Sequence, residues 1–438
     1  MALRHVSNRI CPTPLKSPSR NCGGLFICIN HICELKSSNL LQKLYFQRLI
    51  RIGFQIYSRE FLLVQALPSK LVHRLVLMNA LISFLMGSLG FSIQLIKRDF
   101  ELTRVTAAWH NIGWAAALVF MSILLLGHGH RRPVHQRMRI GWIVLIFGSV
   151  LYCLSPNIYL SVPAVVLTAS GSVIVGNTAA ALLGSHSKTA LRNIFRSTGA
   201  GLFAAALSPT IIGVTTQIDI PWRLTMASTA IVIGIIAIFL IPQVEAQPKT
   251  DLKDRKIIWN KPVLLILAFA FLTIMMEVGL SAWAVDLLIE RGAQIKTSVL
   301  VATIAPYFIA LTRIYLSYKK SHNLNRIWIF TIVSVTFGVG LIIFTNSPTF
   351  TLIGLIVAAI GIGPSPSIAM TNASASEQGS DRGIAVFAMG MGLSCGASPW
   401  IMGLVSESRG FAAAYVVILV ALVLSTYLFV KINRKATI

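Results

Sequence analysis

A single carboxylate stands inside a long apolar stretch of this sequence. The stretch runs from Pro262 to Gly292, and its first part is apolar except for Thr273 until Glu277 is reached. A run of this length can cross a bilayer of about 30 Å as a helix, which would place Glu277 about 22 Å along it. A charge at such a depth is costly by about 3 kcal/mol or more and usually faces a protein interior or a water-filled path.

The position of Glu277 points to proton chemistry. A carboxylate in a dry site can take up a proton, which removes the charge that opposes closure of the site. Thr273, Glu277 and Ser281 are spaced four residues apart, so they share one helical face, and the rest of the helix would face lipid. No second charge is obvious in the sequence. We therefore predict that Glu277 faces a central cavity and carries a coupling proton; the alternative is that it pairs with a neighbouring helix.

The composition excludes a soluble enzyme. The chain has 438 residues, of which 55% are hydrophobic and only 12% charged, and apolar runs of membrane-spanning length recur along it. They are continuous, unlike the short alternating segments of a membrane β-barrel. We predict twelve transmembrane helices, at 75–96, 105–126, 140–154, 158–183, 199–215, 224–241, 262–289, 297–318, 327–345, 350–373, 384–405 and 411–430.

The net charge of +24 is explained by topology rather than by nucleic-acid binding. Lys and Arg concentrate in alternate loops and in the N-terminal tail, as expected when basic loops stay in the cytoplasm. This pattern predicts a multi-pass protein of the cell membrane with both termini cytoplasmic. The excess charge would contact anionic lipid.

Polar breaks divide the chain into four parts. Residues 1–74 read as a basic cytoplasmic tail, disordered over 1–38 and amphipathic over 39–66, where a basic helix would lie on the inner leaflet. Residues 75–242 form the first group of six spans, 243–261 a cytoplasmic linker, and 262–438 the second group with a short tail. The tail cysteines match no usual zinc spacing, so we predict no metal site.

The two groups of spans contain a repeated motif. The predicted fifth span ends with Ser208 and Pro209, and the eleventh ends with Ser398 and Pro399. An isoleucine and a glycine follow at the same spacing in both. This agreement indicates two halves with the same orientation.

Together these features resemble the major facilitator superfamily over residues 75–431. The run Pro221-Trp222-Arg223 is similar to the signature that opens the family's sixth helix, and Glu277 to Trp283 with Asp286 resembles the seventh helix of one branch of small-molecule permeases. The family's basic loop motif after span two is degraded, since Gly127 and arginines remain without the acid. The resemblance implies an all-α membrane protein, with twelve helices in two pseudo-symmetric six-helix bundles. It also implies a monomeric secondary transporter that works by alternating access and needs no cofactor.

The candidate site residues follow from polar side chains inside spans and from the family's architecture. Each has an alternative role as a hydrogen bond between helices. The expected substrate pathway comprises Asn79, Gln94, His110, Asn111, Asn177, Thr273, Ser281, Trp283 and Asn372. The expected gating residues are Arg131, Arg132 and Arg313, the last standing near the inner end of span eight.

Three functions remain open from the sequence. A proton-coupled transporter of a small organic solute is the main one, with a passive facilitator or channel as the alternative. A multispan membrane enzyme would need a cluster of acids, histidines or metal ligands near one membrane face, and none is visible. The scarcity of charge in the spans argues against a highly charged substrate such as citrate and favours a neutral sugar, nucleoside or hydrophobic drug.

Overall fold

The computed structural model describes residues 67–128, 132–186, 188–242, 259–319, 321–376 and 379–434, and all regular secondary structure within them is helical. The tail over 1–66 and linker residues 243–258 lie outside these ranges, together with the amphipathic helix predicted for 39–66. The first helix of the described residues begins at Ser69, inside the segment that we assigned to the tail.

Six helices form the N-terminal half. They overlap the first six predicted spans, although α4, α6 and α8 begin six to nine residues earlier than predicted. The helices are α4 (Ser69–Asp99), α5 (Arg104–His128), α6 (Val134–Leu154), α7 (Ile158–Gly184), α8 (Ala190–Gln217) and α9 (Trp222–Leu240). The C-terminal half contains α10 (Lys261–Ala282), α11 (Ala284–Glu290), α12 (Ile295–Ser317), α13 (Leu324–Phe344), α14 (Pro348–Ile362), α15 (Pro364–Ser374) and α16 (Ser380–Arg434).

All twelve predicted spans correspond to helices. Ten described helical stretches are long and apolar enough to cross a bilayer. One of these, Ser380–Asn433, holds two crossings that meet at Gly410, whose φ of 81° and ψ of 165° are not helical. Glycine adopts this backbone without the strain that a side chain would add. The remaining crossing is α12.

Two predicted spans are interrupted where we expected single helices. The span at 262–289 breaks at Trp283 (φ −120°, ψ 15°), which separates α10 from α11. The span at 350–373 changes from α14 to α15 at Gly363. Pro364 explains the second break, because a proline has no N–H to continue the hydrogen-bond ladder.

Asparagine caps begin three of the helices. The side chains of Asn157, Asn260 and Asn323 each accept a hydrogen bond from a backbone N–H three residues later. Each cap satisfies one of the N–H groups that a helix start leaves unpaired. These caps set the first residues of α7, α10 and α13.

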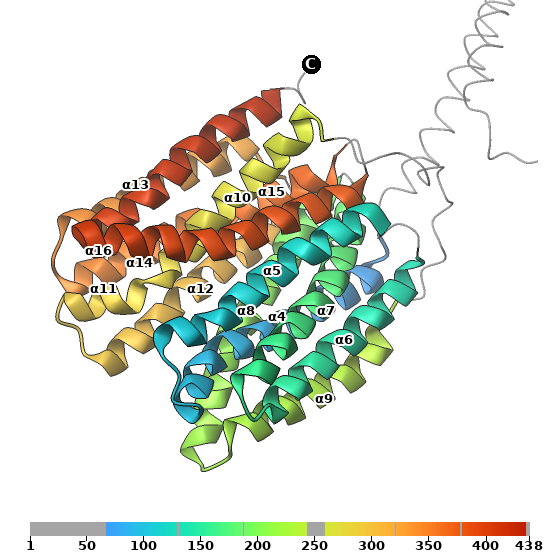
Figure 1. The fold of residues 1–438 in the computed structure, drawn as a ribbon. Coiled ribbons are helices and arrows are strands. Elements are labelled where there is room, and N and C mark those ends of the chain that lie inside the picture. The colour runs from blue at the N-terminus through green and yellow to red at the C-terminus, as the bar shows by residue number, and fades with distance from the viewer. Residues whose placement is uncertain are drawn as a thin grey trace, which may run out of the picture. The chain divides into compact units, whose positions relative to one another are not determined.

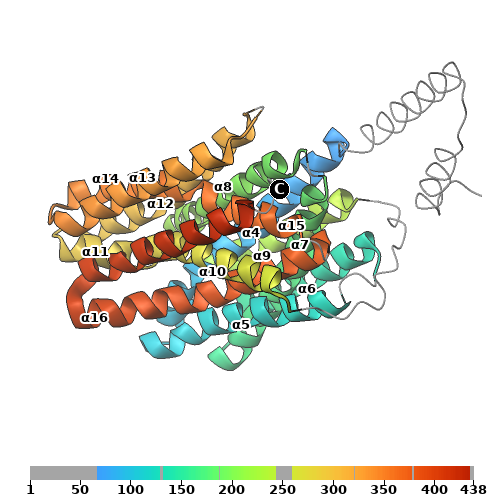
Figure 2. The same ribbon diagram turned by 90° about the horizontal axis from the view of Figure 1, so that it is seen from above.

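The two halves use the same helix pairings. In the N-terminal half α4 packs along α8 and α6 along α7, and in the C-terminal half α10 packs along the first part of α16 and α13 along α14. Across the halves, α5 contacts α16 and α8 contacts α12 (Figures 1 and 2). This pattern matches two six-helix units related by a pseudo-two-fold axis.

The outer surface of the helices is apolar. Large side chains such as Phe120, Phe147, Phe239 and Phe337 are exposed, as expected for faces that contact lipid. By contrast, most of α10 is enclosed, and Phe269, Met276 and Leu280 belong to the core of the C-terminal half. Our expectation that α10 faces lipid apart from one polar stripe was therefore wrong.

Candidate functional site

An ion pair lies in the interior of the C-terminal half. Arg313 Nη2 of α12 donates a hydrogen bond to Glu277 Oε2 of α10. The exposed fraction of the side chain is 5% for Arg313 and 17% for Glu277, so the pair is mostly removed from solvent. The expectation that Glu277 has no charged partner is therefore wrong. Arg313, expected in a gate, uses its guanidinium inside this half instead.

A second hydrogen bond fixes the arginine. Arg313 Nε donates to Gly363 O over 2.7 Å, where α14 gives way to α15. The carbonyl groups at a helix end lack partners within the helix and are good acceptors. The guanidinium thus connects three helical crossings, through α10, α12 and the α14–α15 break.

One polar atom of each partner remains open. Among the described residues, Glu277 Oε1 and Arg313 Nη1 have no hydrogen-bond partner, yet neither is one of the fully enclosed unpaired side-chain atoms. The Glu277 side chain keeps 17% of its surface exposed, so the pair reaches accessible space on that side. One acceptor atom and one donor atom of the pair are thus without a described hydrogen bond.

The N-terminal half packs directly on this pair. A Cβ added at Gly199 of α8 would lie 3.0 Å from the Cβ of Arg313 and 3.0 Å from the backbone nitrogen of Ile314. This close approach of α8 and α12 requires a residue without a side chain. Any motion that separates α8 from α12 would change the surroundings of Arg313.

The other polar residues of the seventh crossing have no described hydrogen bond to Glu277. Thr273 is fully buried and donates to Phe269 O and Ala270 O of its own helix. Trp283 Nε1 donates to Pro399 O over 3.0 Å and so ties α10 to α16. Ser281 is half-buried.

The candidates on the first two crossings have contacts within their own half. Asn79 Nδ2 donates to Ser197 O over 2.9 Å, which joins α4 to α8. We predicted that His110 lines the substrate pathway. In this structure its side chain is fully buried, with Nε2 at 2.8 Å from Ser161 Oγ. Asn111 is exposed. The side chain of Gln94 lies outside the described part.

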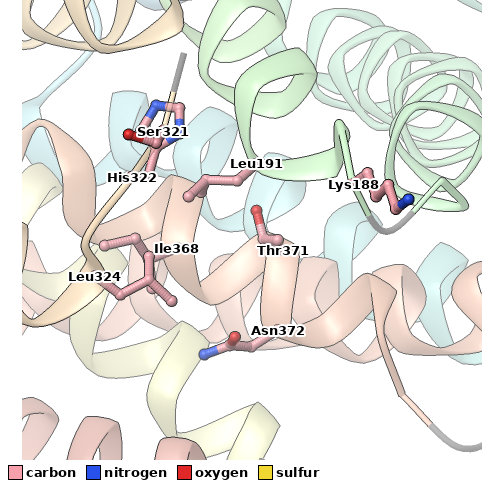
Figure 3. A pocket seen from close by; sticks show the side chains of 8 residues that line it. All are labelled: Lys188, Leu191, Ser321, His322, Leu324, Ile368, Thr371 and Asn372. Carbon is pink, nitrogen blue, oxygen red and sulfur yellow. The ribbon is translucent and has the colours of Figure 1, made fainter. Parts of the chain in front are cut away.

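Asn177 of α7 and Asn372 of α15 share an unusual feature. The Nδ2 atom of each is enclosed and has no hydrogen-bond partner. Asn372 also lines a cavity of about 330 Å³ (Figure 3). The side chains around it come from both halves and include no carboxylate: Lys188, Leu191, Ser321, His322, Leu324, Ile368, Thr371 and Asn372.

This cavity lies at one end of the bundle, which we call the basic end: the end with the α5–α6, α7–α8, α12–α13 and α15–α16 connections. The described polar contacts between the halves include several at this end. Arg137 of α6 pairs with Asp381 of α16 at 3.3 Å. Ser380 Oγ donates to Ala181 O over 2.8 Å. A Cβ added at Gly184 would lie 2.4 Å from the Cβ of Ser374, so Gly184 packs closely against the Ser374 side chain.

Closure continues along α8 toward the middle of the bundle. Thr198 Oγ1 lies 2.9 Å from Ser367 Oγ. Further along, Tyr307 of α12 donates to Ala206 O over 3.0 Å. The halves are therefore joined by polar contacts from the basic end up to about the level of α8's midpoint.

At the opposite end, the polar contacts between described residues join residues of the same half. Asp99 Oδ2 accepts from Trp222 Nε1 and from Arg223 Nε, both over 3.2 Å, which joins the end of α4 to the start of α9. In the C-terminal half, Arg291 donates to Thr351 Oγ1 and Ile342 O. The signature Pro221-Trp222-Arg223 thus has a structural role in its own half.

The described contacts between the halves at the basic end do not use Arg131 or Arg132, which we predicted as gating residues. Arg131 lies outside the described residues, and Arg132 is exposed. Arg137 is one of the arginines of the degraded loop motif but was not among the predicted gating residues, and Asp381 was not predicted to have a role. The loop motif after the second crossing lacks its acid. Instead Asp381, an acid of the C-terminal half, contacts Arg137 of the N-terminal half. Among the described residues no group of His, Cys, Asp and Glu could hold a metal ion.

Comparisons with known proteins agree with this architecture. Residues 75–363 match a sequence model of the Major Facilitator Superfamily. The fold is similar to that of the transporter FucP in the outward conformation (TM-score 0.69, 11% identity, 82% of this chain and 97% of that one). It is also similar to a bacterial homologue of the iron transporter ferroportin in its outward-facing state (TM-score 0.66, 14% identity, 83% of this chain and 99% of that one). The human organic anion transporter MFSD10 is a third match (TM-score 0.64, 10% identity, 83% of this chain and 100% of that one). No curated protein matches the sequence.

Proposed function

This chain belongs to the Major Facilitator Superfamily, and we propose that it is a secondary transporter that moves a small organic solute together with a proton by alternating access. The family assignment makes it a membrane transporter and not an enzyme. The finer proposal depends mainly on one observation, the buried Glu277–Arg313 pair beside the contact between the halves.

The distribution of contacts between the halves supports alternating access. Polar contacts join them at the basic end, whereas the polar contacts of the described residues at the opposite end stay within each half. In a rocking motion, the basic-end contacts would break as contacts at the opposite end form. The structure therefore corresponds to a state that is closed at the basic end.

Glu277 is the proposed proton carrier. Among the described residues it is an acid enclosed within a crossing, and its side chain keeps 17% of its surface exposed. A proton that binds there changes the charge of the site at the surface where α8 and α12 meet. Such a change would alter the relative stability of the two access states, which is what coupling requires.

The variant Glu277→Gln tests proton coupling. The solute is one identified by an uptake screen, and the purified variant is reconstituted in proteoliposomes. We expect the variant to lose the accumulation of this solute that a pH gradient drives, but to keep exchange of labelled for unlabelled solute. The matched control is Glu290→Gln, because Glu290 is an exposed acid in the same half. Accumulation that persists in Glu277→Gln would show that the proton uses another group or that another ion drives transport.

The same assay separates a carrier from a passive pore. A carrier returns to the other side faster when it is loaded, so unlabelled solute inside the vesicle accelerates entry of labelled solute. A channel shows no such counterflow. Absence of counterflow in the wild-type protein would favour the passive alternative.

We further propose that the basic end faces the cytoplasm, because Lys188, Arg192 and Lys319 lie there and basic loops are retained inside. The connection between α13 and α14, which includes Asn346, would then be external. A cysteine placed at Asn346 should react with an impermeant reagent added outside intact cells. Reaction from the cytoplasmic side alone would reverse the orientation.

A further inference from the structure

We infer that the solute is a monoanion whose carboxylate or equivalent group binds Arg313 when Glu277 accepts its proton. This inference rests on the proposed role of Glu277 and adds the class of solute. It starts from the charge of the ion pair, which is zero when Glu277 is ionised, and from the hydrogen bonds of Arg313, which use its Nε and Nη2 atoms.

The charge of the site limits what can bind with the proton. When a proton binds Glu277, the positive charge of Arg313 loses its partner in the interior of the C-terminal half. An isolated charge in such surroundings is strongly disfavoured. A neutral solute leaves this cost in place, whereas a monoanion restores a net charge of zero. Proton and monoanion therefore bind together more readily than either does alone.

The geometry provides a place for the anion. Arg313 is held by Gly363 O through Nε, which leaves its outer nitrogens for Glu277 and for a ligand. A guanidinium presents its donors in one plane and binds a carboxylate through two parallel hydrogen bonds. Protonation gives the Glu277 carboxyl group an O–H donor, so Glu277 and Arg313 can then both donate hydrogen bonds to the same anion.

Few other groups compete with this chemistry. Of the helices packed against α10, α14 and α15 carry no titratable side chain. The first part of α16 contributes Cys395, close enough to interact with Glu277, and Tyr415 of its second part donates to Leu280 O. The acids Asp286 and Glu290 belong to α11, beyond the break at Trp283. Arg313 is the cation that faces Glu277 among the described residues.

The test uses the full chain purified in detergent and the probe formate, which is the smallest carboxylate. Formamide is its neutral counterpart, and benzoate with benzamide forms a larger pair. Binding is measured as thermal stabilisation and by calorimetry at about pH 6 and about pH 8, with proton uptake followed by a pH indicator.

Wild-type protein should bind formate at least about tenfold more tightly at the lower pH and take up a proton as it binds. Formamide should not bind. Glu277→Gln should bind formate with similar affinity at both pH values and without proton uptake, because the variant mimics the protonated acid. The control Arg326→Gln removes an exposed cation of the same half and should behave as wild type.

Variants of the arginine complete the test. Arg313→Gln should abolish formate binding. If Arg313→Gln fails to fold, Arg313→Lys retains the charge and should bind formate more weakly than wild type, because it lacks the planar pair of donors. The result for Glu277→Gln does not depend on either of these variants.

The inference is overturned if Glu277→Gln binds neither carboxylate better than its amide, or if formate binding is unchanged in Arg313→Gln. Its failure is distinct from failure of the proposed function. A protein that concentrates a neutral solute with protons, and loses this in Glu277→Gln, would keep proton coupling and refute the monoanion. Accumulation that survives in Glu277→Gln would refute the coupling role itself.

Discussion

The two halves place the same helix contact in different chemical surroundings. In the N-terminal half, Gly87 of α4 lies against Ser208 of α8, and in the C-terminal half Gly279 of α10 lies against Ser398 of α16. Two residues before each glycine, the N-terminal half has the buried Leu85 and the C-terminal half has Glu277. The packing is repeated, whereas the ion pair is not.

This difference separates architecture from function. A glycine against a small polar residue lets two helices approach closely, and both halves need that approach. A buried acid and base add nothing to helix packing that apolar side chains could not provide, since such pairs are often replaceable without loss of stability. We therefore expect substitutions at the shared contact to affect folding, and substitutions at the pair to affect function once its charge is balanced.

The largest effect should come from leaving one charge of the pair alone. Arg313→Met is expected to destabilise the protein by about 3–5 kcal/mol, because Glu277 would remain without its partner. The double variant Glu277→Gln with Arg313→Met should recover most of this loss. Unfolding of each variant in the same detergent measures both values. A double variant as unstable as Arg313→Met would mean that the arginine acts through packing alone.

The repeated glycines should differ in their tolerance of a methyl group. A Cβ at Gly87 would lie 2.2 Å from Ala205 O, which is backbone, whereas a Cβ at Gly279 would first meet Met402 Sδ at 2.8 Å. A methionine side chain can move aside more easily than a backbone. We expect Gly87→Ala to cost about 1–3 kcal/mol and Gly279→Ala less. Equal thermal shifts would show that α8 adjusts as readily as α16.

These contacts also show how far the sequence could be interpreted. Hydrophobic run length predicted all twelve crossings, because a bilayer imposes one simple requirement on helix length. The repeated Ser-Pro motif identified the equivalent helices α8 and α16. The breaks at Trp283 and Gly363 were not predicted, since each lies within a continuous apolar run.

The ion pair was missed even though both members were visible. Glu277 and Arg313 are an acid and a base inside consecutive crossings of one half, and such groups usually pair with each other. The positions of the two residues along their crossings concealed this pairing. Arg313 is near the C-terminal end of α12, and its long side chain reaches Glu277. The buried state of His110 was also missed, since its partner Ser161 lies on α7.

The contact between the halves at the basic end should have a smaller effect. Arg137 pairs with Asp381, whose side chain is 38% exposed, so the pair contributes about 1 kcal/mol or less. Asp381→Asn should shift the population toward opening of the basic end by up to about fivefold. Spin labels on α6 and α16 report the distance change. The exchanged pair Arg137→Asp with Asp381→Arg should restore the wild-type distribution, and a failure to restore it would argue against a direct charge contact.

The smallest effect should come from Asn79, which the structure places as a link between α4 and α8. Loss of its hydrogen bond to Ser197 O in Asn79→Leu should cost about 0.6 kcal/mol and leave solute exchange intact. Thermal unfolding and counterflow on the same preparation measure both. A stable Asn79→Leu protein without exchange would return Asn79 to the substrate pathway.

The claim that Glu277 changes its protonation state against Arg313 is tested most directly by infrared difference spectroscopy. Isotopically labelled formate is added to the full chain, so that the ligand's bands are displaced from those of the protein. Wild-type protein and the Glu290→Gln control should show a new C=O band of a protonated carboxyl group, and Glu277→Gln should lack it. The absence of this band from wild type, or its persistence in Glu277→Gln, would contradict the claim.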